Sequence, residues 1–279
     1  MAAEISSTRS SGQDVPVADI PVVILCGGQG TRLREASESL PKPLVDIGGR
    51  PILWHIMKTY SHYGFRRFVL CLGYKADLIK DHFVHQRLRA NDFTLQLHSG
   101  SEPEFHTAVE TEDWEITFAE TGLTTATGAR IKRVAKYLDA PRFALTYGDG
   151  IGSVDLPAAL AAHTASGRTG TLTGVHPAGR YGEMAIDGDA VTQFSEKSDQ
   201  VGYINGGFFF FERHFVDDYL TDDPSVMLEH APLQRLAQDG GLGIYRHEGF
   251  WMGMDTFRDW KDLNARWDAG DAPWAVWQS

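Results

Sequence analysis

Apolar residues in the first part of the chain alternate between short continuous runs and helically spaced positions. Residues 21–25 (PVVIL) form a continuous apolar run followed by glycines, which is typical of a buried parallel strand. Residues 51–63 carry apolar side chains at helical spacing and begin with a proline suited to a first turn. Residues 68–72 form the next buried run, and residues 76–83 the next helical segment. This order of strand, helix, strand and helix predicts an α/β domain with a parallel sheet.

The rest of the chain adds elements of both kinds. Residues 92–120 contain β-rich segments around an acidic stretch, and residues 184–212 contain short β-like segments separated by turn residues. The run Phe208 to Phe211 is typical of the core of a sheet. Further elements are predicted as helices at 131–138, 156–166 and 257–267, and as strands at 142–147 and 170–175. We therefore predict a single domain over residues 20–279, with a Rossmann-like, mostly parallel sheet, flanking helices and a smaller β-rich part.

The first twenty residues are mainly small and polar, without the apolar core of a signal peptide. We expect residues 1–19 to form a disordered or loosely held extension, the alternative being an arm that packs on a neighbouring subunit. No apolar run approaches the ~18 residues that a transmembrane helix needs. These observations predict a cytoplasmic protein without a membrane partner.

The net charge of −11, with no lysine-rich or arginine-rich run, argues against a nucleic-acid partner, because phosphate backbones need a positive face. An acidic protein that binds a polyphosphate must do so locally, with a few placed cations, backbone N–H groups and a metal ion. Cys26 and Cys71 both lie in apolar runs, so we expect buried, reduced thiols.

A glycine-rich segment, Gly27-Gly28-Gln29-Gly30-Thr31-Arg32, follows the first predicted strand. Glycines at this place let backbone N–H groups surround a phosphate. A P-loop would need Gly-Lys-Ser/Thr after its last glycine, and a dinucleotide fingerprint would need a glycine where Leu33 stands. The segment belongs to neither class, and alone it is explained equally well by a tight turn between a strand and a helix.

A lysine between two prolines, Pro41-Lys42-Pro43, comes ten residues later. The prolines stiffen the backbone, so this lysine can act as a fixed point charge beside phosphates. Taken alone, Pro-Lys-Pro is better explained as a surface loop.

Two aspartates stand out by their positions. Asp149 lies between glycines directly after a predicted buried strand, and ligands of α/β sheets collect at the carboxyl ends of strands. Its alternative role is that of an Asp-Gly turn residue. Asp255 lies among apolar residues, where it could also be the N-cap of the helix that starts near Thr256. Two carboxylates suit Mg²⁺, which keeps the rest of its coordination shell for phosphates and water.

Together, residues 27–33 (GGQGTRL) and 41–53 (PKPLVDIGGRPIL) resemble the sugar-1-phosphate nucleotidyltransferases. Other segments resemble the cytidylyl branch of that family, which makes CDP-glucose: WHIMK at 54–58, GYK at 73–75, LTYGDG at 145–150, INGGFF at 204–209, GFW at 249–251 and MDT at 254–256. The likeness runs from about residue 20 to the C-terminus. It implies the nucleotide-diphospho-sugar transferase fold, with a nucleotide-binding part at about 20–150 and a sugar-binding and C-terminal part at about 151–279.

The resemblance also implies a role for individual residues. Nucleotide binding falls to Leu25, Cys26, Gly27, Gly28, Gly30, Thr31, Thr125, Arg130 and Gly148. The catalytic residues are Arg32 and Lys42, both on the reacting phosphates, and Asp149. Sugar-phosphate binding falls to Gly182, Glu196, Lys197, Asn205 and Gly206. Mg²⁺ is held by Asp149 and Asp255. The chain departs from the family at Ala129, where a second glycine is usual, and at Ser198, where related families often have proline.

The implied reaction transfers a cytidylyl group from CTP to α-D-glucose 1-phosphate, a sugar 1-phosphate, and releases pyrophosphate. Two alternatives stay open: the same chemistry with dTTP, UTP or another sugar 1-phosphate, and a non-catalytic nucleotide-sensing module. The presence of Lys42, Asp149 and Asp255 argues against the second. Members of the branch are homo-oligomers, often hexamers, so the resemblance also implies a homo-oligomer.

Overall fold

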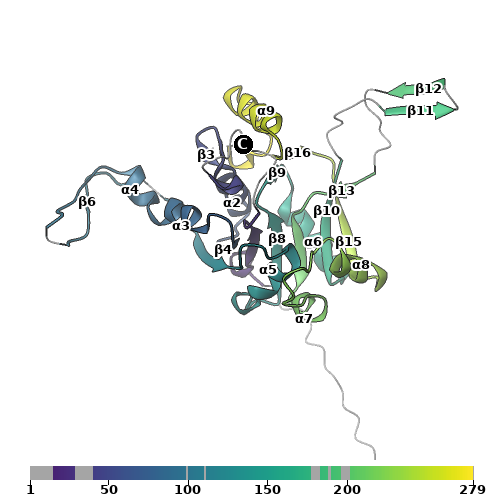
Figure 1. Cartoon of the computed structure of the whole chain (residues 1–279), viewed down its shortest axis with the longest axis horizontal. Coiled ribbons are helices and arrows are strands. Elements are labelled where there is room, and N and C mark those ends of the chain that lie inside the picture. The colour runs from purple at the N-terminus through teal and green to yellow at the C-terminus, as the bar shows by residue number, and fades with distance from the viewer. Residues whose placement is uncertain are drawn as a thin grey trace, which may run out of the picture.

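A mixed β-sheet forms the centre of the molecule (Figure 1). The structure, a computed structural model, describes residues 15–28, 40–98, 100–109, 111–176, 183–187, 190–195 and 202–278, with only the backbone described at 183–187 and 190–195. Within this part of the chain, eight strands form the sheet in the order β13-β10-β14-β8-β1-β4-β7, and β15 pairs with β10.

The N-terminal half of the sheet is parallel and the C-terminal half is mostly antiparallel. The parallel strands are β1 (Val22–Leu25), β4 (Arg67–Leu72), β7 (Glu115–Glu120) and β8 (Arg142–Tyr147). The others are β10 (Gly170–Val175), β13 (Ile204–Asn205), β14 (Phe209–Glu212) and β15 (Leu242–His247). Strand β14 pairs antiparallel with both β8 and β10, whereas β15 runs parallel to β10. The predicted α/β class is confirmed, and the antiparallel pairs belong to the β-rich C-terminal part.

Alternate side chains of each strand enter separate cores on the two faces of the sheet, as strand geometry requires. In β1, Val22 and Ile24 face one core and Val23 faces the other. Phe208 to Phe211 alternate in the same way, which confirms that this run is sheet core. The first core is covered by α2 (Ile52–His62), α6 (Leu156–Ser166) and α9 (Phe257–Asp268), and the second by α5 (Thr127–Arg133), α7 (Phe215–Asp218) and α8 (Ala231–Gln238).

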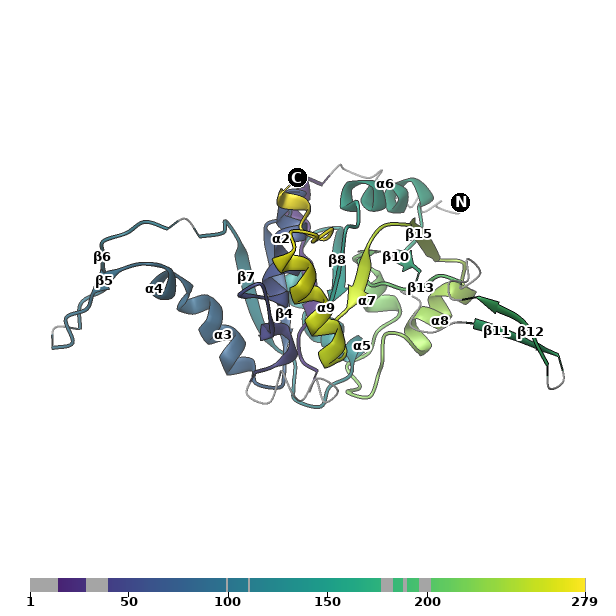
Figure 2. The same ribbon diagram turned by 90° about the horizontal axis from the view of Figure 1, so that it is seen from above.

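Two segments project from opposite sides of this body (Figure 2). One consists of α3 (Ala76–Val84), α4 (Gln86–Ala90) and the pair β5 (Phe93–Thr94) and β6 (Glu104–Phe105). The other is the hairpin β11 (Glu183–Asp187) and β12 (Ala190–Ser195). Two smaller ribbons complete the fold: β2 (Asp46–Ile47) with β3 (Arg50–Pro51), and β9 (Gly150–Gly152) with β16 (Trp251–Gly253).

The helix predicted at 131–138 is wrong in its bounds. The helix α5 begins at Thr127 and ends at Arg133, and a separate 3-10 helix, Ala135–Tyr137, follows it. The early start has a tertiary cause, because the Val226 carbonyl accepts hydrogen bonds from the N–H groups of Gly128 (3.0 Å) and Ala129 (3.2 Å). A distant segment thereby satisfies N–H groups that a helix leaves unpaired at its start.

The structure describes the last residues of the predicted N-terminal extension and both cysteines. Residues 1–14 of the predicted extension lie outside the described residues, whereas Val15 and Val17 pack against the first core. Cys26 and Cys71 are buried free thiols, as predicted, on opposite faces of the sheet. Among the described residues, no helix combines the length and apolar character that crossing a membrane requires.

Candidate active site

The carboxyl ends of β1 and β8 bring two glycine segments together. Leu25 lies beside Tyr147 in the parallel register, and the Gly148 N–H donates to the Leu25 carbonyl at 3.1 Å. A Cβ on Gly148 would lie 2.8 Å from that carbonyl oxygen, so the close approach requires glycine. Among the described residues, nothing lies within 4 Å of the place where Gly28 would carry a Cβ. The start of the predicted nucleotide loop is adjacent to Asp149.

Lys42 joins the two aspartates that the sequence singled out. It begins the 3-10 helix Lys42–Leu44, and its Nζ donates to Asp149 Oδ2 at 2.6 Å and to Asp255 Oδ1 at 2.8 Å. Its side chain is 12% exposed, against 38% and 48% for those of Asp149 and Asp255. Burial alone would lower the pKa of Lys42, but the charges and hydrogen bonds of the two aspartates raise it above its ordinary value. Lys42 is thus a permanent cation, and three distant segments meet at its ammonium group.

The β9–β16 ribbon holds the two carboxylates side by side. Asp149 immediately precedes β9, Gly150 pairs with Gly253, and the Met254 N–H donates to the Asp149 carbonyl at 2.8 Å. The alternative role of Asp255 as a helix N-cap is wrong. The N-cap of α9 is Thr256, which forms a capping box with Asp259, so the Asp255 carboxylate is oriented toward Lys42 instead.

The carboxylates of Asp149 and Asp255 fit a divalent cation that takes few protein ligands. Both converge on one point, where the Lys42 ammonium stands as a monovalent cation. No group of three or more histidine, cysteine, aspartate or glutamate side chains with metal-binding geometry occurs in the described part of the chain. Two carboxylates match Mg²⁺, which completes its octahedron with phosphate and water oxygens, better than a metal that needs an all-protein cage.

Arg130 supports the glycine segment from beneath. Its side chain is buried, and Nη1 donates to the Leu72 carbonyl at 2.9 Å and to Thr121 Oγ1 at 2.7 Å, while Nη2 donates to the Gly27 carbonyl at 3.1 Å. Burial lowers the pKa of Arg130 from its ordinary value. A Cβ on Gly27 would lie 2.1 Å from Nη1, so the guanidinium can lie there only beneath a glycine.

Thr125 is one of the residues predicted to bind the nucleotide. It is buried, and its Oγ1 accepts a hydrogen bond from Arg133 Nη1 at 2.7 Å. Arg133 also donates to the Thr121 carbonyl and pairs with Asp222 at 2.8 Å. This segment is consequently held in place by the loop that precedes α8.

Asn205 and Gly206, predicted on the sugar-phosphate side, contact the end of β8 and the β9–β16 ribbon. Asn205 Nδ2 donates to the Tyr147 hydroxyl at 3.0 Å. Trp251 Nε1 donates to the Gly206 carbonyl at 2.8 Å, and the Trp251 ring lies over Gly150. Trp251 is half-buried and links the sugar side to the Asp149 turn.

Two residues of this region were missed by the sequence analysis. The Tyr147 hydroxyl donates to Glu229 Oε1 at 2.7 Å, and both side chains are half-buried. Burial, with the charge and hydrogen bond of Glu229, raises the pKa of Tyr147 well above its ordinary value. Tyr147 offered a signal, since it precedes Gly148-Asp149 at the end of a buried strand, whereas the segment around Glu229 has no motif.

Six of the predicted site residues lie outside the described part of the chain: Gly30, Thr31, Arg32, Gly182, Glu196 and Lys197. Their roles stay predictions.

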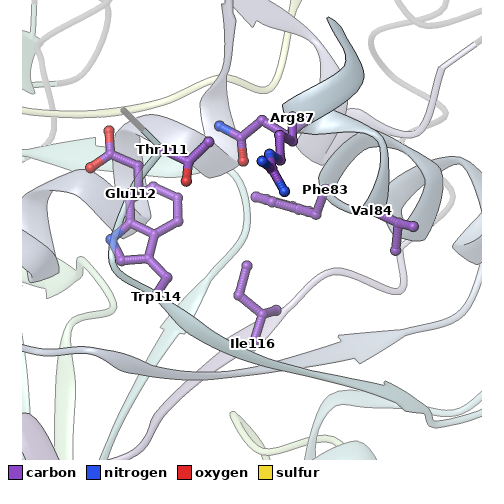
Figure 3. A pocket seen from close by; sticks show the side chains of 8 residues that line it. Phe83, Val84, Arg87, Thr111, Glu112, Trp114 and Ile116 are labelled. Carbon is purple, nitrogen blue, oxygen red and sulfur yellow. The ribbon is translucent and has the colours of Figure 1, made fainter. Parts of the chain in front are cut away.

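A separate hollow of about 190 Å³ lies where the projecting helices join the sheet (Figure 3). Phe83 and Val84 from α3 and Arg87 from α4 line one side, facing Trp114 and Ile116 of the β7 segment. None of the residues predicted for nucleotide, sugar or metal binding lines this hollow.

Comparisons with known proteins identify the family. The family model described as "Nucleotidyl transferase" matches residues 21–265. The chain is 43% identical over 258 residues to the glucose-1-phosphate cytidylyltransferase of Salmonella typhi, covering 92% of this chain and 99% of that protein. It is 42% identical over 255 residues to the Bacillus subtilis (strain 168) protein named "Probable glucose-1-phosphate cytidylyltransferase", covering 91% and 99%.

A solved structure supports the fold as well. The crystal structure of HddC from Yersinia pseudotuberculosis complexed with GMP-PN matches with a TM-score of 0.64 and 26% identity, covering 89% of this chain and 99% of that one. The family match over most of the chain, together with the identity to the two cytidylyltransferases, shows that the chain belongs to the nucleotidyl transferase family.

Proposed function

We propose that this protein transfers a cytidylyl group from CTP to α-D-glucose 1-phosphate and forms CDP-glucose and pyrophosphate. The identity of 43% over 258 residues to a glucose-1-phosphate cytidylyltransferase supports the choice of substrates. The observation that carries the chemistry is the convergence of Lys42 with Asp149 and Asp255, at 2.6 and 2.8 Å, beside the glycine segment.

The reaction needs positioning and charge neutralisation more than covalent help from the protein. An anionic oxygen of the sugar phosphate attacks the α-phosphorus of CTP in line and forms the new phosphoanhydride bond. The bond between the α-phosphorus and the bridging oxygen breaks on the opposite side, and its electron pair leaves with pyrophosphate. Because two polyanions must approach each other, fixed cations and backbone N–H groups provide most of the acceleration.

Asp149 and Asp255 would hold Mg²⁺, which, when bound, neutralises phosphate charge and orients the reacting oxygens. Lys42 supplies a permanent charge beside the reacting phosphates, consistent with its raised pKa. The Gly27-Gly28 backbone receives the nucleotide phosphates, and Arg130 fixes the position of Gly27 through its hydrogen bond to the carbonyl. The resemblance to the family adds three charged residues to the proposed site: Arg32 on the reacting phosphates, and Glu196 and Lys197 on the sugar phosphate.

Asn205 and Gly206 would lie against the sugar phosphate. Asn205 contacts Tyr147 and Gly206 contacts Trp251, so this segment lies close to the Asp149 turn. We also propose that the protein works as a homo-oligomer, whose size sedimentation velocity would measure.

Pyrophosphate release tests the proposal directly. CTP, dTTP, UTP and GTP are crossed with glucose 1-phosphate and other sugar 1-phosphates, with and without Mg²⁺. We expect the highest kcat/KM with CTP and glucose 1-phosphate, and no turnover without Mg²⁺. Faster turnover with dTTP or UTP would reject the base assignment.

A substitution locates the reaction at this site. Asp149→Asn should abolish pyrophosphate release while the circular dichroism spectrum stays unchanged. Asp262→Asn, the same chemical change on the exposed face of α9, is the matched control and should keep wild-type turnover. Near-normal turnover of the Asp149 variant would remove that carboxylate from the mechanism.

A further inference from the structure

A chain of four side chains connects the sugar side of the site to the start of α5. Asn205 Nδ2 donates to the Tyr147 hydroxyl at 3.0 Å, and Tyr147 donates to Glu229 Oε1 at 2.7 Å. From the other end, Thr127 Oγ1 donates to Glu229 Oε2 at 2.8 Å. The Leu228 N–H donates to the same threonine oxygen at 2.8 Å. The Glu229 carboxylate is therefore the common acceptor of two hydrogen-bond chains.

The Glu229 carboxylate sets the direction of the hydrogen bonds that run through Tyr147 to Asn205. A carboxylate can only accept hydrogen bonds, so the Tyr147 hydroxyl must donate its single hydrogen to Glu229. The tyrosine oxygen is then an acceptor toward Asn205, and only the amide nitrogen of Asn205 can face it. On the other side of the amide, Asn205 Oδ1 accepts the Gly207 N–H at 3.0 Å. The two contacts together fix which end of the amide faces which way.

The backbone around Asn205 reinforces this orientation. Gly207 has φ of +78° and Phe208 of +45°, so the chain turns sharply directly after the amide that it hydrogen-bonds. The left-handed conformation at Phe208 is costly for a residue with a side chain, and surrounding contacts must hold it. Here the Phe208 ring is buried in the first core, and the Phe208 carbonyl accepts from Thr173 Oγ1 at 2.9 Å.

We propose that Glu229 is a positioning residue for the sugar 1-phosphate, which acts through Tyr147 to present an amide N–H of Asn205 to the substrate. The inference rests on the proposed function, because it takes Asn205 as a contact of the sugar phosphate. An amide nitrogen has two hydrogens, of which Tyr147 accepts one. The second hydrogen of the Asn205 amide can be donated to a phosphate or hydroxyl oxygen of the substrate. If the amide were flipped, its oxygen would instead face the anionic substrate and repel it.

The Glu229 carboxylate also connects the sugar side of the site to the nucleotide side. Thr127 is the first residue of α5, which carries Arg130 beneath the glycine segment. Glu229 follows the Val226 segment that satisfies the first N–H groups of that helix. One side chain therefore sets the orientation of a sugar contact and bonds to the helix that supports the nucleotide loop.

Replacing Glu229 by glutamine changes one acceptor oxygen into a donor nitrogen and keeps the size of the side chain. A glutamine has one amide oxygen, so Tyr147 and Thr127 can no longer both donate to an oxygen at position 229. With the glutamine nitrogen opposite Tyr147, the tyrosine hydrogen turns toward Asn205 and opposes the amide N–H that faces it. We expect Glu229→Gln to raise the KM for glucose 1-phosphate about tenfold, the size of one lost hydrogen bond of about 1.4 kcal/mol, with kcat and the KM for CTP near wild type. Tyr147→Phe removes the connecting hydroxyl and should have the same effect.

The double variant and a matched control make the test specific. Once Tyr147 is phenylalanine, Glu229→Gln should add nothing, because residues of one network are not additive. Asp239→Asn is the control, since Asp239 accepts from the Tyr219 hydroxyl at 2.9 Å in the same kind of contact away from Asn205. It should leave both KM values unchanged. A merely structural role of Glu229 would instead loosen α5 and raise the KM for CTP equally.

The outcomes separate this inference from the proposed function. If the wild-type enzyme does not turn over CTP and glucose 1-phosphate, both are overturned. If the wild type is active but Glu229→Gln and Tyr147→Phe keep the wild-type KM for glucose 1-phosphate, or if their effects multiply in the double variant, the positioning role alone is overturned. If Glu229→Gln fails to fold, Tyr147→Phe decides the matter, because its ring can keep its packing against Phe209.

Discussion

A buried histidine of α2 makes the folded protein sensitive to mild acid. His55 is fully buried, and its Nε2 lies 2.9 Å from the Ile47 carbonyl. Trp274 Nε1 donates to His55 Nδ1 at 3.4 Å. Because an indole nitrogen can only donate and a carbonyl can only accept, Nδ1 must be the bare nitrogen and Nε2 must carry the hydrogen. The fold thus selects a neutral imidazole, and burial lowers the pKa of His55 from 6.5 to about 4.

The sign and size of the effect follow from the pKa of His55 in the two states. From about one pH unit above 6.5 upward, the imidazole is almost entirely neutral both folded and unfolded, so it adds almost no pH dependence. Between pH 6.5 and 4 the unfolded chain binds a proton that the folded chain refuses, so stability falls as the pH falls. The full difference corresponds to about 3 kcal/mol, of which about 2 kcal/mol is lost between pH 7.5 and pH 5.

Urea unfolding at pH 7.5, 6 and 5 measures this contribution. In His55→Gln, the amide can still donate to Ile47 and accept from Trp274 but does not titrate. We expect the free energy of unfolding of the wild type to fall by about 2 kcal/mol more than that of His55→Gln over this range. His62→Gln, on the exposed end of the same helix, is the matched control and should follow the wild type. Parallel pH dependence of the wild type and His55→Gln would refute the reasoning.

Two further predictions concern the cations of the site. Lys42→Met should lower kcat for pyrophosphate release about 10²–10³-fold, the scale of one lost electrostatic contact. Lys42→Met should also increase the affinity for Mn²⁺ in the absence of nucleotide, because the ammonium group no longer competes for Asp149 and Asp255. Electron paramagnetic resonance measures this affinity, and an unchanged value would contradict the prediction. Arg130→Met removes the hydrogen bond to the Gly27 carbonyl, whereas the Leu72 carbonyl still accepts from the N–H and the hydroxyl of Thr121. The free energy of unfolding should therefore fall by about 1–3 kcal/mol in urea titrations, and an unchanged value would show that solvent replaces the guanidinium.

The parts of the fold that the sequence predicted correctly carry local signals. The central parallel strands β1 and β4 contain continuous apolar runs because both faces of the sheet are covered there, and α2 repeats its apolar residues at the helical period. The start of α5 was misplaced because its first N–H groups bond to Val226, and no pattern within the helix itself records that contact. The helix α8 was missed because it is short, and the strand β15 because its side chains are mostly half-buried or exposed, which leaves no continuous apolar run.

The candidate site divides in the same way. Lys42, Asp149 and Asp255 stood out by their neighbours in sequence, yet their meeting depends on separations of 107 and 213 residues and could only be expected from the family resemblance. Glu229 gave no signal, because its importance comes from Tyr147 and Thr127, which lie 82 and 102 residues away. A lone glutamate is unremarkable in sequence until the fold supplies the donors that converge on it.

The β9–β16 ribbon has a consequence for how the chain can change length. Its pairs, from Gly150 with Gly253 to Gly152 with Trp251, are made by backbone groups, and Asp149 and Asp255 lie just beyond its end. A single inserted or deleted residue before Asp255 would shift the register and turn alternate side chains to the other face. We therefore expect homologues to have no insertions or deletions at residues 249–255 and to differ in length only in loops away from the carboxylates.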